Sequence, residues 1–341
     1  VPLFTVSVIN EVKAVKTITI GPNDAGQRLD KFLQKYMPAL PVSMMYKYIR
    51  KKRVKLNRKK AAPDTKLLEG DVLDLYISDE FFSDGGGIDG TGIGETEAFY
   101  TLRPKLDIAY EDGNILIVNK PAGMVVHEDE HEKRYTLIDY IKAYLYQNGS
   151  YRPEEENSFA PALCNRIDRN TSGLVIAAKT AEALRVMNQK IRDRELTKYY
   201  LSIVHGEPSP ACGTIKGYLR KDAEKNKVFV RNKPEEGART AITKYRTLES
   251  KGSLSLLEVE LITGRTHQIR AHMASIGHPL LGDGKYGTNE QNRPFGVRHQ
   301  ALCAYKLAFH FTTPAYGLDY LNGKTIELPH AREQVGWEPL T

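Results

Sequence analysis

The chain has 341 residues and a net charge of +7, and 41% of its residues are hydrophobic. This length allows two or three domains, and the composition excludes an intrinsically disordered chain. The three cysteines, Cys164, Cys212 and Cys303, form no Cys-x-x-Cys pair. This excludes a disulfide framework and a thiolate zinc site, and favours the cytoplasm.

No apolar run approaches about 18 residues, so we expect no membrane-spanning helix. The opening segment VPLFTVSVIN lacks a basic leader, so we expect no signal peptide, and the missing methionine predicts a trimmed end.

The first 78 residues predict a small module of two helices and a few strands. A strand is expected over 15–20, and the turn residues 21–24 end it. One face of a first helix is formed by Leu29, Phe32, Leu33 and Tyr36. Ser43 can cap a second helix, and a further strand is expected over 72–77.

The most basic stretch of the chain lies between Ser43 and Lys60. It has no acidic residue and nine cations: Lys47, Arg50, Lys51, Lys52, Arg53, Lys55, Arg58, Lys59 and Lys60. A solvated helix face normally mixes both signs, so this run predicts a surface that binds nucleic-acid phosphates. The alternative is an ordinary charged solvent face.

Residues 79–104 contain GGGIDGTGIG and no apolar periodicity, and they predict a flexible linker. Gly85, Gly87 and Gly90 match Gly-x-Gly-x-x-Gly, as does the segment 282–287. A dinucleotide site needs a strand before the glycines and a helix after them. The first match has neither and no helix pattern follows the second, so we expect only a tight structural loop at 282–287.

From residue 105 onward, many strands are expected with few helices. Strands are expected at 115–118, 124–127, 174–178, 199–204, 240–246, 254–261 and 299–311, with a turn at 120–123 between the first two. Helices are expected at 137–145, after a Thr180 cap, and from Thr266 or His267. This pattern predicts an α+β domain around a mixed or antiparallel central sheet, preceded by the small α/β module.

A carboxylate between two arginines lies at the centre of this region. In CNRIDRNTSGLVIAAK, Asp168 is flanked by Arg166 and Arg169, and the turn-forming residues 170–173 lead into a buried strand. A neighbouring arginine lowers the pKa of an aspartate by roughly 1–3 units. An ionised carboxylate suits a nucleophile or an electrostatic stabiliser, and does not suit a general acid. The alternative is a surface cluster that caps a turn.

The segment TGRTHQIRAHMASIGH adds arginines and histidines. Arg265 and Arg270 are five residues apart and project differently, so one can reach a phosphate while the other turns toward a buried carboxylate. His267 and His272 lie on different helix faces, whereas the zincin pattern needs histidines four apart with a glutamate between them. We therefore expect no metal site.

Together these segments resemble the RluA-type pseudouridine synthases, and most of all their RluC branch. NRIDRNTSGLVIAAK is similar to the catalytic motif of the family, TKYYLSIVHG to its tyrosine motif, TGRTHQIRAHMASIGHPLLGDGKYG to its arginine motif and NKPAGMVVH to its first hairpin. The leading module resembles the S4-like (alpha-L) RNA-binding domain through RLDKFL, IRKKRVKLNRK and EGDVLDL. Asn165 stands where many members have histidine, and Lys52 and Arg58 replace common glycines.

The resemblance implies that the protein isomerises uridine to pseudouridine in RNA without a cofactor. It implies three catalytic roles. Asp168 is the essential carboxylate, acting by covalent addition or through a glycal. Tyr200 stacks on the target base and helps to remove the proton from its ring carbon, and Arg270 forms an ion pair with Asp168. RNA contacts are implied for Arg166, Arg169, Thr171, Lys198, Arg265 and His267, and on the leading module for Arg50, Lys51, Lys52 and Arg53.

We therefore predict a cytoplasmic, monomeric enzyme that modifies large-subunit (23S) ribosomal RNA, with another structured RNA as the alternative substrate. A non-catalytic RNA-binding or ribosome-assembly factor on the same fold would need a damaged site. A glycosidic hydrolase would need a second carboxylate, for which Glu195 is the nearest candidate. The predicted domains are an N-terminal strand and extension (1–25), the S4-like domain (26–78), the linker (79–104) and the catalytic domain (105–341).

Overall fold

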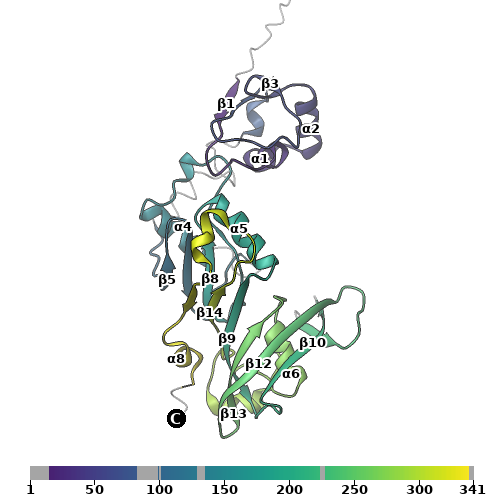
Figure 1. The fold of residues 1–341 in the computed structure, drawn as a ribbon, viewed down its shortest axis with the longest axis vertical. Coiled ribbons are helices and arrows are strands. Elements are labelled where there is room, and N and C mark those ends of the chain that lie inside the picture. Colours follow the sequence, from purple (N-terminus) through teal and green to yellow (C-terminus); the bar gives the residue numbers. More distant parts are fainter. Residues whose placement is uncertain (1–14, 83–98, 100, 129–134, 223–226, 338–341) are drawn as a thin grey trace, which may run out of the picture. The chain divides into compact units, whose positions relative to one another are not determined.

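The computed structural model describes residues 15–82, 99, 101–128, 135–222 and 227–337. They form two compact units, one within 1–102 together with 145–160, the other within 103–144 together with 161–341 (Figure 1). Most of the predicted linker, and residues 1–14 of the predicted extension, lie outside the described residues. None of the helices in the described ranges is long and apolar enough to cross a membrane.

In its described residues, the first unit contains an antiparallel sheet with the strand order β1-β4-β2-β3 together with the helices α1 and α2. The bounds of its elements are β1 Lys16–Thr19, α1 Leu29–Tyr36, α2 Val42–Arg50, β2 Val54–Leu56, β3 Lys59–Lys60, β4 Val72–Leu75, and the 3-10 helices η1 Asp79–Phe81 and η2 Pro153–Glu155. Leu29, Phe32 and Leu33 are fully buried in one core with β4. The apolar face predicted for the first helix is therefore confirmed.

The start of α2 differs from the sequence prediction. The helix begins at Val42, Pro41 is its N-cap residue, and no side chain caps it, so the Ser43 cap is wrong. Pro41 has φ −56° and ψ 136°. Proline fixes φ near this value at no cost to the helix entrance, so the ring sets the start in place of a serine hydroxyl.

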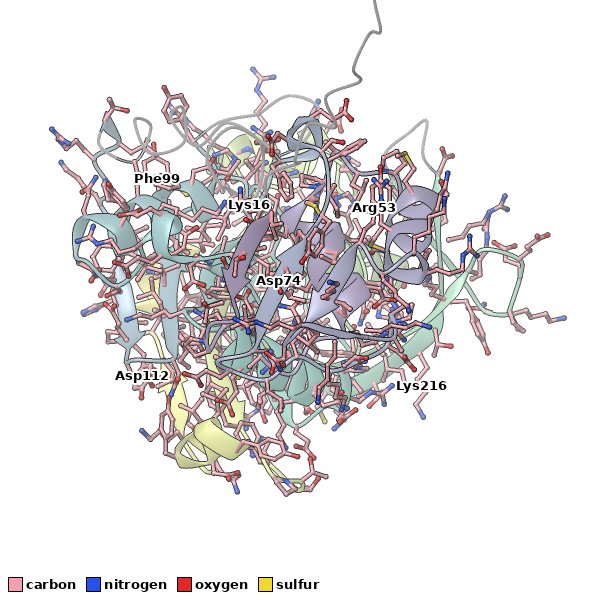
Figure 2. The ribbon with its side chains drawn as sticks, turned by 90° about the horizontal axis from the view of Figure 1, so that it is seen from above. Lys16, Arg53, Asp74, Phe99, Asp112 and Lys216 are labelled. Carbon is pink, nitrogen blue, oxygen red and sulfur yellow. The ribbon has the colours of Figure 1, made fainter. Side chains whose placement is uncertain are left out.

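The basic run of the first unit includes two strained turns. Lys52 and Arg58, which replace glycines common in the family, have φ of 59° and 64°. Glycine adopts such values easily because it has no β-carbon. Arg53, labelled in Figure 2, lies between them in the chain, and its guanidinium carbon is 5.2 Å from the centre of the Tyr48 ring. The run thus places cations at positions where the backbone favours glycine.

A large mixed sheet forms the second unit. Its strand order is β11-β10-β12-β13-β9-β14-β8-β6-β5, with β15 paired to β14 and β7 to β8 (Figure 1). β14 runs parallel to β8 and antiparallel to β9. The predicted α+β class with a mixed central sheet is confirmed.

The strand bounds of this unit are β5 Ile108–Glu111, β6 Ile115–Lys120, β7 Ala162–Leu163, β8 Ser172–Ala178, β9 Leu196–His205, β10 Cys212–Asp222, β11 Lys227–Arg231, β12 Arg239–Lys251, β13 Leu254–Leu261, β14 Leu302–Phe309 and β15 Thr325–Glu327. The helix bounds are α4 Leu137–Gln147, α5 Ala181–Arg192, α6 Gln268–Ser275, α7 Asn289–Asn292, η3 Arg293–Phe295, η4 Tyr316–Leu321 and α8 Ala331–Val335; the last three residues of α4 group with the first unit. Thr180 caps α5 as predicted, accepting a hydrogen bond from the Ala183 amide at 3.1 Å.

The strand predicted over 124–127 is not formed. β6 ends at Lys120, and the residues that follow it form turns. Lys120 is fully buried, and its Nζ donates to the carbonyl oxygens of Pro121 and Met124 at 2.8 and 2.7 Å. These carbonyls therefore bond to a side chain and not to a neighbouring strand.

Strand register brings the Asp168 loop next to Tyr200. Gly173 of β8 and Tyr200 of β9 both lie opposite Ala304 of the central strand β14. Gly173 has φ +112°, and a β-carbon there would lie 2.3 Å from the Ala304 carbonyl oxygen, so only glycine allows this approach. Because neighbouring strands are about 4.8 Å apart, Gly173 and Tyr200 are about 10 Å apart across β14, which brings the loop that precedes Gly173 within side-chain reach of Tyr200.

Candidate active site

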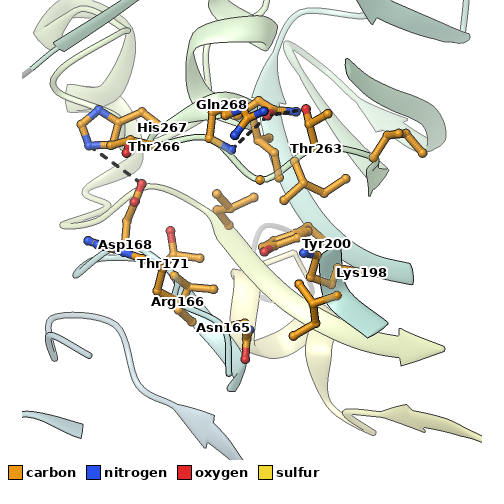
Figure 3. A pocket seen from close by; sticks show the side chains of 18 of the residues that line it. Asn165, Arg166, Asp168, Thr171, Lys198, Tyr200, Thr263, Thr266, His267 and Gln268 are labelled. Atoms are coloured by element: carbon orange, nitrogen blue, oxygen red, sulfur yellow. Dashed lines mark hydrogen bonds and ion pairs between the residues drawn. The ribbon is translucent and has the colours of Figure 1, made fainter. Parts of the chain in front are cut away.

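A pocket of about 490 Å³ lies in the second unit, lined by the loop before β8, by β9 and by the start of α6 (Figure 3). The three residues with implied catalytic roles, Asp168, Tyr200 and Arg270, all line it. Five of the residues with implied RNA contacts also line it: Arg166, Thr171, Lys198, Arg265 and His267. The fold thus gathers motifs that are far apart in the chain into one cavity.

Asp168 is the carboxylate at one end of this pocket. Its side chain is 28% exposed, and its Oδ2 lies 3.5 Å from Nη1 of Arg270 and 4.0 Å from Nε2 of His267. Its Oδ1 has no hydrogen-bond partner among the residues that the structure describes. One oxygen is therefore oriented by cationic and polar groups, and the other is available to a substrate.

Arg270 is held mainly by a carboxylate that the sequence analysis missed. Its Nε and Nη2 donate to Oδ2 and Oδ1 of Asp283 at 2.6 and 2.8 Å, and Asp283 is fully buried. Burial opposes both charges, but the paired hydrogen bonds outweigh it, so the pKa of Asp283 is lowered and that of Arg270 is raised. The loop predicted only as a structural turn therefore fixes the guanidinium beside Asp168.

His267 faces Asp168 from the residue before α6. It has φ 52°, and its Nδ1 lies 3.1 Å from the Tyr286 hydroxyl, which accepts a hydrogen bond from the Val228 amide at 2.9 Å. The hydroxyl proton is then free to be donated to Nδ1, which leaves the ring proton on Nε2, the atom nearer Asp168. Burial lowers the pKa of His267, so the ring is a neutral donor.

Gln268 fixes the loop that carries His267 and Arg265. It is buried, and its Oε1 accepts hydrogen bonds from the Thr263 hydroxyl at 2.8 Å and from the Arg265 amide at 3.1 Å. Its Nε2 donates to the Ile242 carbonyl and the Thr243 hydroxyl of β12 at 3.0 and 2.9 Å. The motif contains this glutamine, but its partners on β12 could not be identified from spacing.

Comparison with known proteins identifies the family of this chain. Residues 114–275 match the family described as RNA pseudouridylate synthase, and residues 27–73 match the S4 domain. An uncharacterized RNA pseudouridine synthase of Mycoplasma genitalium is 34% identical over 83% of this chain and 85% of its own length. This chain belongs to the RNA pseudouridine synthase family.

Other relatives in the family carry a more specific name. The proteins named ribosomal large subunit pseudouridine synthase C of Vibrio vulnificus and Escherichia coli are 33% and 30% identical, each over 90% of this chain and 92% of their own. The solved structure of human RNA pseudouridylate synthase domain containing 4 has a TM-score of 0.52 and 21% identity, covering 72% of this chain and 97% of that chain. That structure supports the fold, and the relatives confirm the resemblance to the RluC branch.

The buried Lys120 and the partly exposed Asn165 hold the Asp168 loop of this pseudouridine synthase. The Nζ of Lys120 donates a third hydrogen bond, to the Arg169 carbonyl at 2.9 Å. Burial lowers the pKa of Lys120 to about 7, against the opposite effect of the charge on Asp168. Asn165 accepts from the Ile176 amide at 2.8 Å and donates to the Leu174 carbonyl at 3.4 Å. The residue that departs from the family thus bonds through both ends of its amide to β8.

Tyr200 forms part of the pocket wall in the enzyme. Its side chain is 5% exposed, and burial, together with the charge on Asp168, raises the pKa of its phenol. The phenol is therefore protonated at neutral pH, and its ring presents a flat apolar face to the cavity.

The other residues with implied RNA contacts are placed differently. Thr171 is 2% exposed and its hydroxyl accepts from the Gln300 amide at 3.2 Å, so in this structure it supports the loop. Arg169 is not among the lining residues, and Arg50 to Arg53 belong to the first unit. Arg192 and Arg194 line the pocket and were missed. Within the described ranges, no group of three or more His, Cys, Asp or Glu side chains could hold a metal ion.

The stability of the enzyme is expected to fall as the pH drops from about 6.5 toward 4. His272 is fully buried, bonded through Nδ1 to the Thr243 hydroxyl at 2.9 Å, and burial lowers its pKa to about 4. The unfolded chain takes up the proton near pH 6.5, whereas the folded chain resists it, so stability present above pH 6.5 is lost as the pH falls. The shift in the pKa of His272 is expected to lower the free energy of unfolding by about 2–3 kcal/mol as the pH falls through this range.

Urea unfolding of the wild type and of the His272→Gln variant between pH 7 and 4.5 measures this slope. The variant is expected to lose less stability over the window, whereas His330→Gln, at an exposed residue, is expected to keep the wild-type slope. Equal slopes for His272→Gln and the wild type would contradict the buried, neutral histidine.

Proposed function

We propose that this enzyme isomerises uridines of large-subunit (23S) ribosomal RNA, with Asp168 as the catalytic carboxylate. The observation that carries the proposal is a partly exposed aspartate held beside Arg270, in a pocket whose other charged lining residues are cations. The names of the relatives from Vibrio vulnificus and Escherichia coli support the choice of RNA.

The same proposal covers location and organisation. The enzyme acts in the cytoplasm, as a monomer and without a metal. It needs no cofactor, because isomerisation of a nucleoside consumes no electrons and no energy-rich bond. The S4-like domain (26–78) holds RNA through its basic run, and the catalytic domain (105–341) follows the linker (79–104).

The proposed chemistry depends on the different surroundings of the two Asp168 carboxylate oxygens. The target uridine leaves its stack and enters the pocket. The bond between C1′ and N1 breaks, the base turns, a bond between C1′ and C5 forms, and the proton leaves C5 while N1 gains one. The free Oδ1 of Asp168 either adds to C1′ or takes the proton from C2′ to give a glycal. Both routes use the Asp168 carboxylate, whose Oδ2 lies 3.5 Å from Nη1 of Arg270 and 4.0 Å from Nε2 of His267.

The two other functions considered from the sequence lack support. A glycosidic hydrolase needs a second acid near the bond, but Asp168 is the only carboxylate among the described residues that line the pocket. Glu195 forms a buried ion pair with Lys190 at 2.6 Å and does not line the pocket. A non-catalytic factor would need a damaged site, whereas Asp168, Tyr200 and Arg270 are all present.

Removing the Tyr200 hydroxyl and removing its ring are expected to give different kinetic defects. Tyr200→Phe keeps the stacking face, so KM is expected to stay near the wild-type value. Its kcat is expected to fall about 10²-fold or more, because the neutral hydroxyl can no longer relay the proton from C5 by accepting it while giving up its own. Tyr200→Leu also removes the face on which a base stacks, which is worth about 1–3 kcal/mol per base, so KM is expected to rise as well. Steady-state kinetics of both variants on one RNA substrate measure this difference, and equal KM values would contradict stacking.

Release of tritium from RNA labelled at C5 of uridine tests the proposal directly. The wild-type enzyme is expected to release tritium from a large-subunit ribosomal RNA transcript and not from a small-subunit transcript of similar length. Release from neither transcript would contradict the proposed substrate. Release from the small-subunit transcript alone would assign the enzyme to another structured RNA.

A further inference from the structure

The pocket has a second charged end, formed by the end of α5 and the start of β9. Arg192, Arg194 and Lys198 line it there. Figure 3 shows Lys198 beside Tyr200 and away from Asp168. Within the described part of the chain, none of these three side chains has a hydrogen-bond or ion-pair partner. Asp168, at the other end, is the only acid among the described residues that line the pocket, so the cations gathered at this end create a local positive potential that attracts anions.

Arg194 adopts a backbone conformation that favours glycine. The Glu195 amide donates to the Lys190 carbonyl at 2.8 Å, and the Arg194 amide donates to the Ile191 carbonyl at 3.3 Å. These two bonds form a Schellman motif, in which the residue at the position of Arg194 is left-handed and usually glycine. Arg194 has φ 62°, which its β-carbon makes unfavourable. An arginine at this place therefore lowers stability relative to glycine.

A buried ion pair keeps this turn from relaxing. Lys190 Nζ and Glu195 Oε2 are 2.6 Å apart, and their side chains are 1% and 6% exposed. Lys190 also donates to the Thr313 hydroxyl at 2.7 Å, and Glu195 accepts a hydrogen bond from the Thr312 hydroxyl. The turn between Lys190 and Glu195 is thus fastened to the segment after β14. The backbone of Arg194 is fixed, while its side chain is exposed at the pocket.

Lys198 is a second cation of this end of the pocket, and its ammonium has no acidic partner among the described residues. It is only partly exposed, and burial lowers its pKa. No acid among the described residues compensates for the hydration that its ammonium loses. A bound anion would supply the missing charge, and Lys198 is only two residues from Tyr200 along β9.

We propose that Arg194, together with Arg192 and Lys198, binds a phosphate group of the RNA strand next to the uridine that faces Asp168. The inference rests on the proposed function, because it takes that strand to be the substrate. A phosphate fits because it offers several acceptor oxygens, and the planar fork of an arginine can donate to two of them. The strain at Arg194 is then retained because a fixed positive charge at this point serves binding.

The Arg194→Gly variant tests this inference because it is expected to change stability and binding in opposite senses. Glycine relieves the left-handed turn, so the melting temperature is expected to rise by about 2–4 °C. Loss of one phosphate contact is expected to weaken binding of a single-stranded uridine decamer about 5- to 10-fold and to reduce the slope of log Kd against log salt by about 0.7. Binding is measured between 50 and 200 mM KCl in the Asp168→Asn background, where no turnover occurs.

Two matched variants separate charge from strain. Arg194→Lys keeps the charge, so it is expected to retain the salt slope. Tyr316→Gly relieves another left-handed residue, which has φ 51°, is 72% exposed and does not line the pocket. It is expected to raise the melting temperature without changing RNA binding.

An unchanged salt slope in Arg194→Gly would overturn the phosphate site, and so would a lower melting temperature, which would indicate a structural role for the arginine. The binding readout is independent of product formation. If the salt slope falls in Arg194→Gly but the wild type forms no pseudouridine, the phosphate site stands and the proposed function is refuted. Pseudouridine formation with an unchanged slope would refute the phosphate site alone.

Discussion

Replacement of Asp168 with asparagine is expected to abolish pseudouridine formation while RNA binding persists. Asparagine keeps the size of the side chain and an acceptor for Arg270, but its neutral amide neither adds to C1′ nor removes the C2′ proton. A loss of about 10⁴-fold or more in the single-turnover rate is expected, because the nucleophile or base itself is removed. Tritium release measures the rate, and RNA binding on filters measures the retained affinity.

The matched control for this experiment is Asp64→Asn, at an exposed carboxylate of the first unit. It is expected to keep both the rate and the affinity. A rate near the wild-type value in Asp168→Asn would refute the catalytic role of this carboxylate, whatever its effect on binding.

Breaking the ion pair between Arg270 and Asp283 is expected to have the largest effect on stability. In Asp283→Ala the buried guanidinium loses both hydrogen bonds, and removal of one partner of a buried pair typically costs about 3–5 kcal/mol. Activity is expected to be lost with it, because the guanidinium is no longer fixed 3.5 Å from Asp168. Urea unfolding and tritium release of the same preparation measure both effects.

A double replacement separates stability from function at this pair. Removal of both charges of a buried ion pair together often keeps stability. Asp283 Oδ1 also accepts hydrogen bonds from the Lys285 and Tyr286 amides at 2.9 and 3.1 Å, so asparagine is used there to keep an acceptor. Arg270→Met with Asp283→Asn is expected to unfold at a urea concentration near that of the wild type and yet form no product. Arg246→Ala, which removes the exposed partner from a pair with Glu258 of β13, is expected to change stability little. Activity in the stable double variant would show that Asp168 needs no guanidinium.

Apolar spacing and turn residues predicted most of the fold because they act locally. The run from Leu174 to Ala178 is buried as β8, and Thr180 caps α5 through its own hydroxyl. The failure at 124–127 has a physical reason as well. Its backbone propensity is that of a strand, but the buried ammonium of Lys120 binds the Met124 carbonyl, and a tertiary contact of this kind leaves no periodic trace in the sequence.

The sequence named residues that the structure gathers in one pocket wherever the motifs carry charged or aromatic side chains. Asp168, Tyr200 and Arg270 come from three motifs, and the register of β8, β14 and β9 brings the first two together. Asp283 was missed because a glycine-rich loop gives no sign that its acid is buried against Arg270. Arg194 was missed because its significance lies in its left-handed backbone, which composition and spacing do not encode.

Mapping of pseudouridines in large-subunit ribosomal RNA tests the central claim most directly. The RNA is taken from cells that lack the gene and from the same cells supplied with the wild-type or the Asp168→Asn gene. Particular uridines are expected to be unmodified without the gene, to become pseudouridine with the wild type, and to stay unmodified with the variant. Identical maps from all three strains would contradict a ribosomal RNA pseudouridine synthase that acts through this carboxylate.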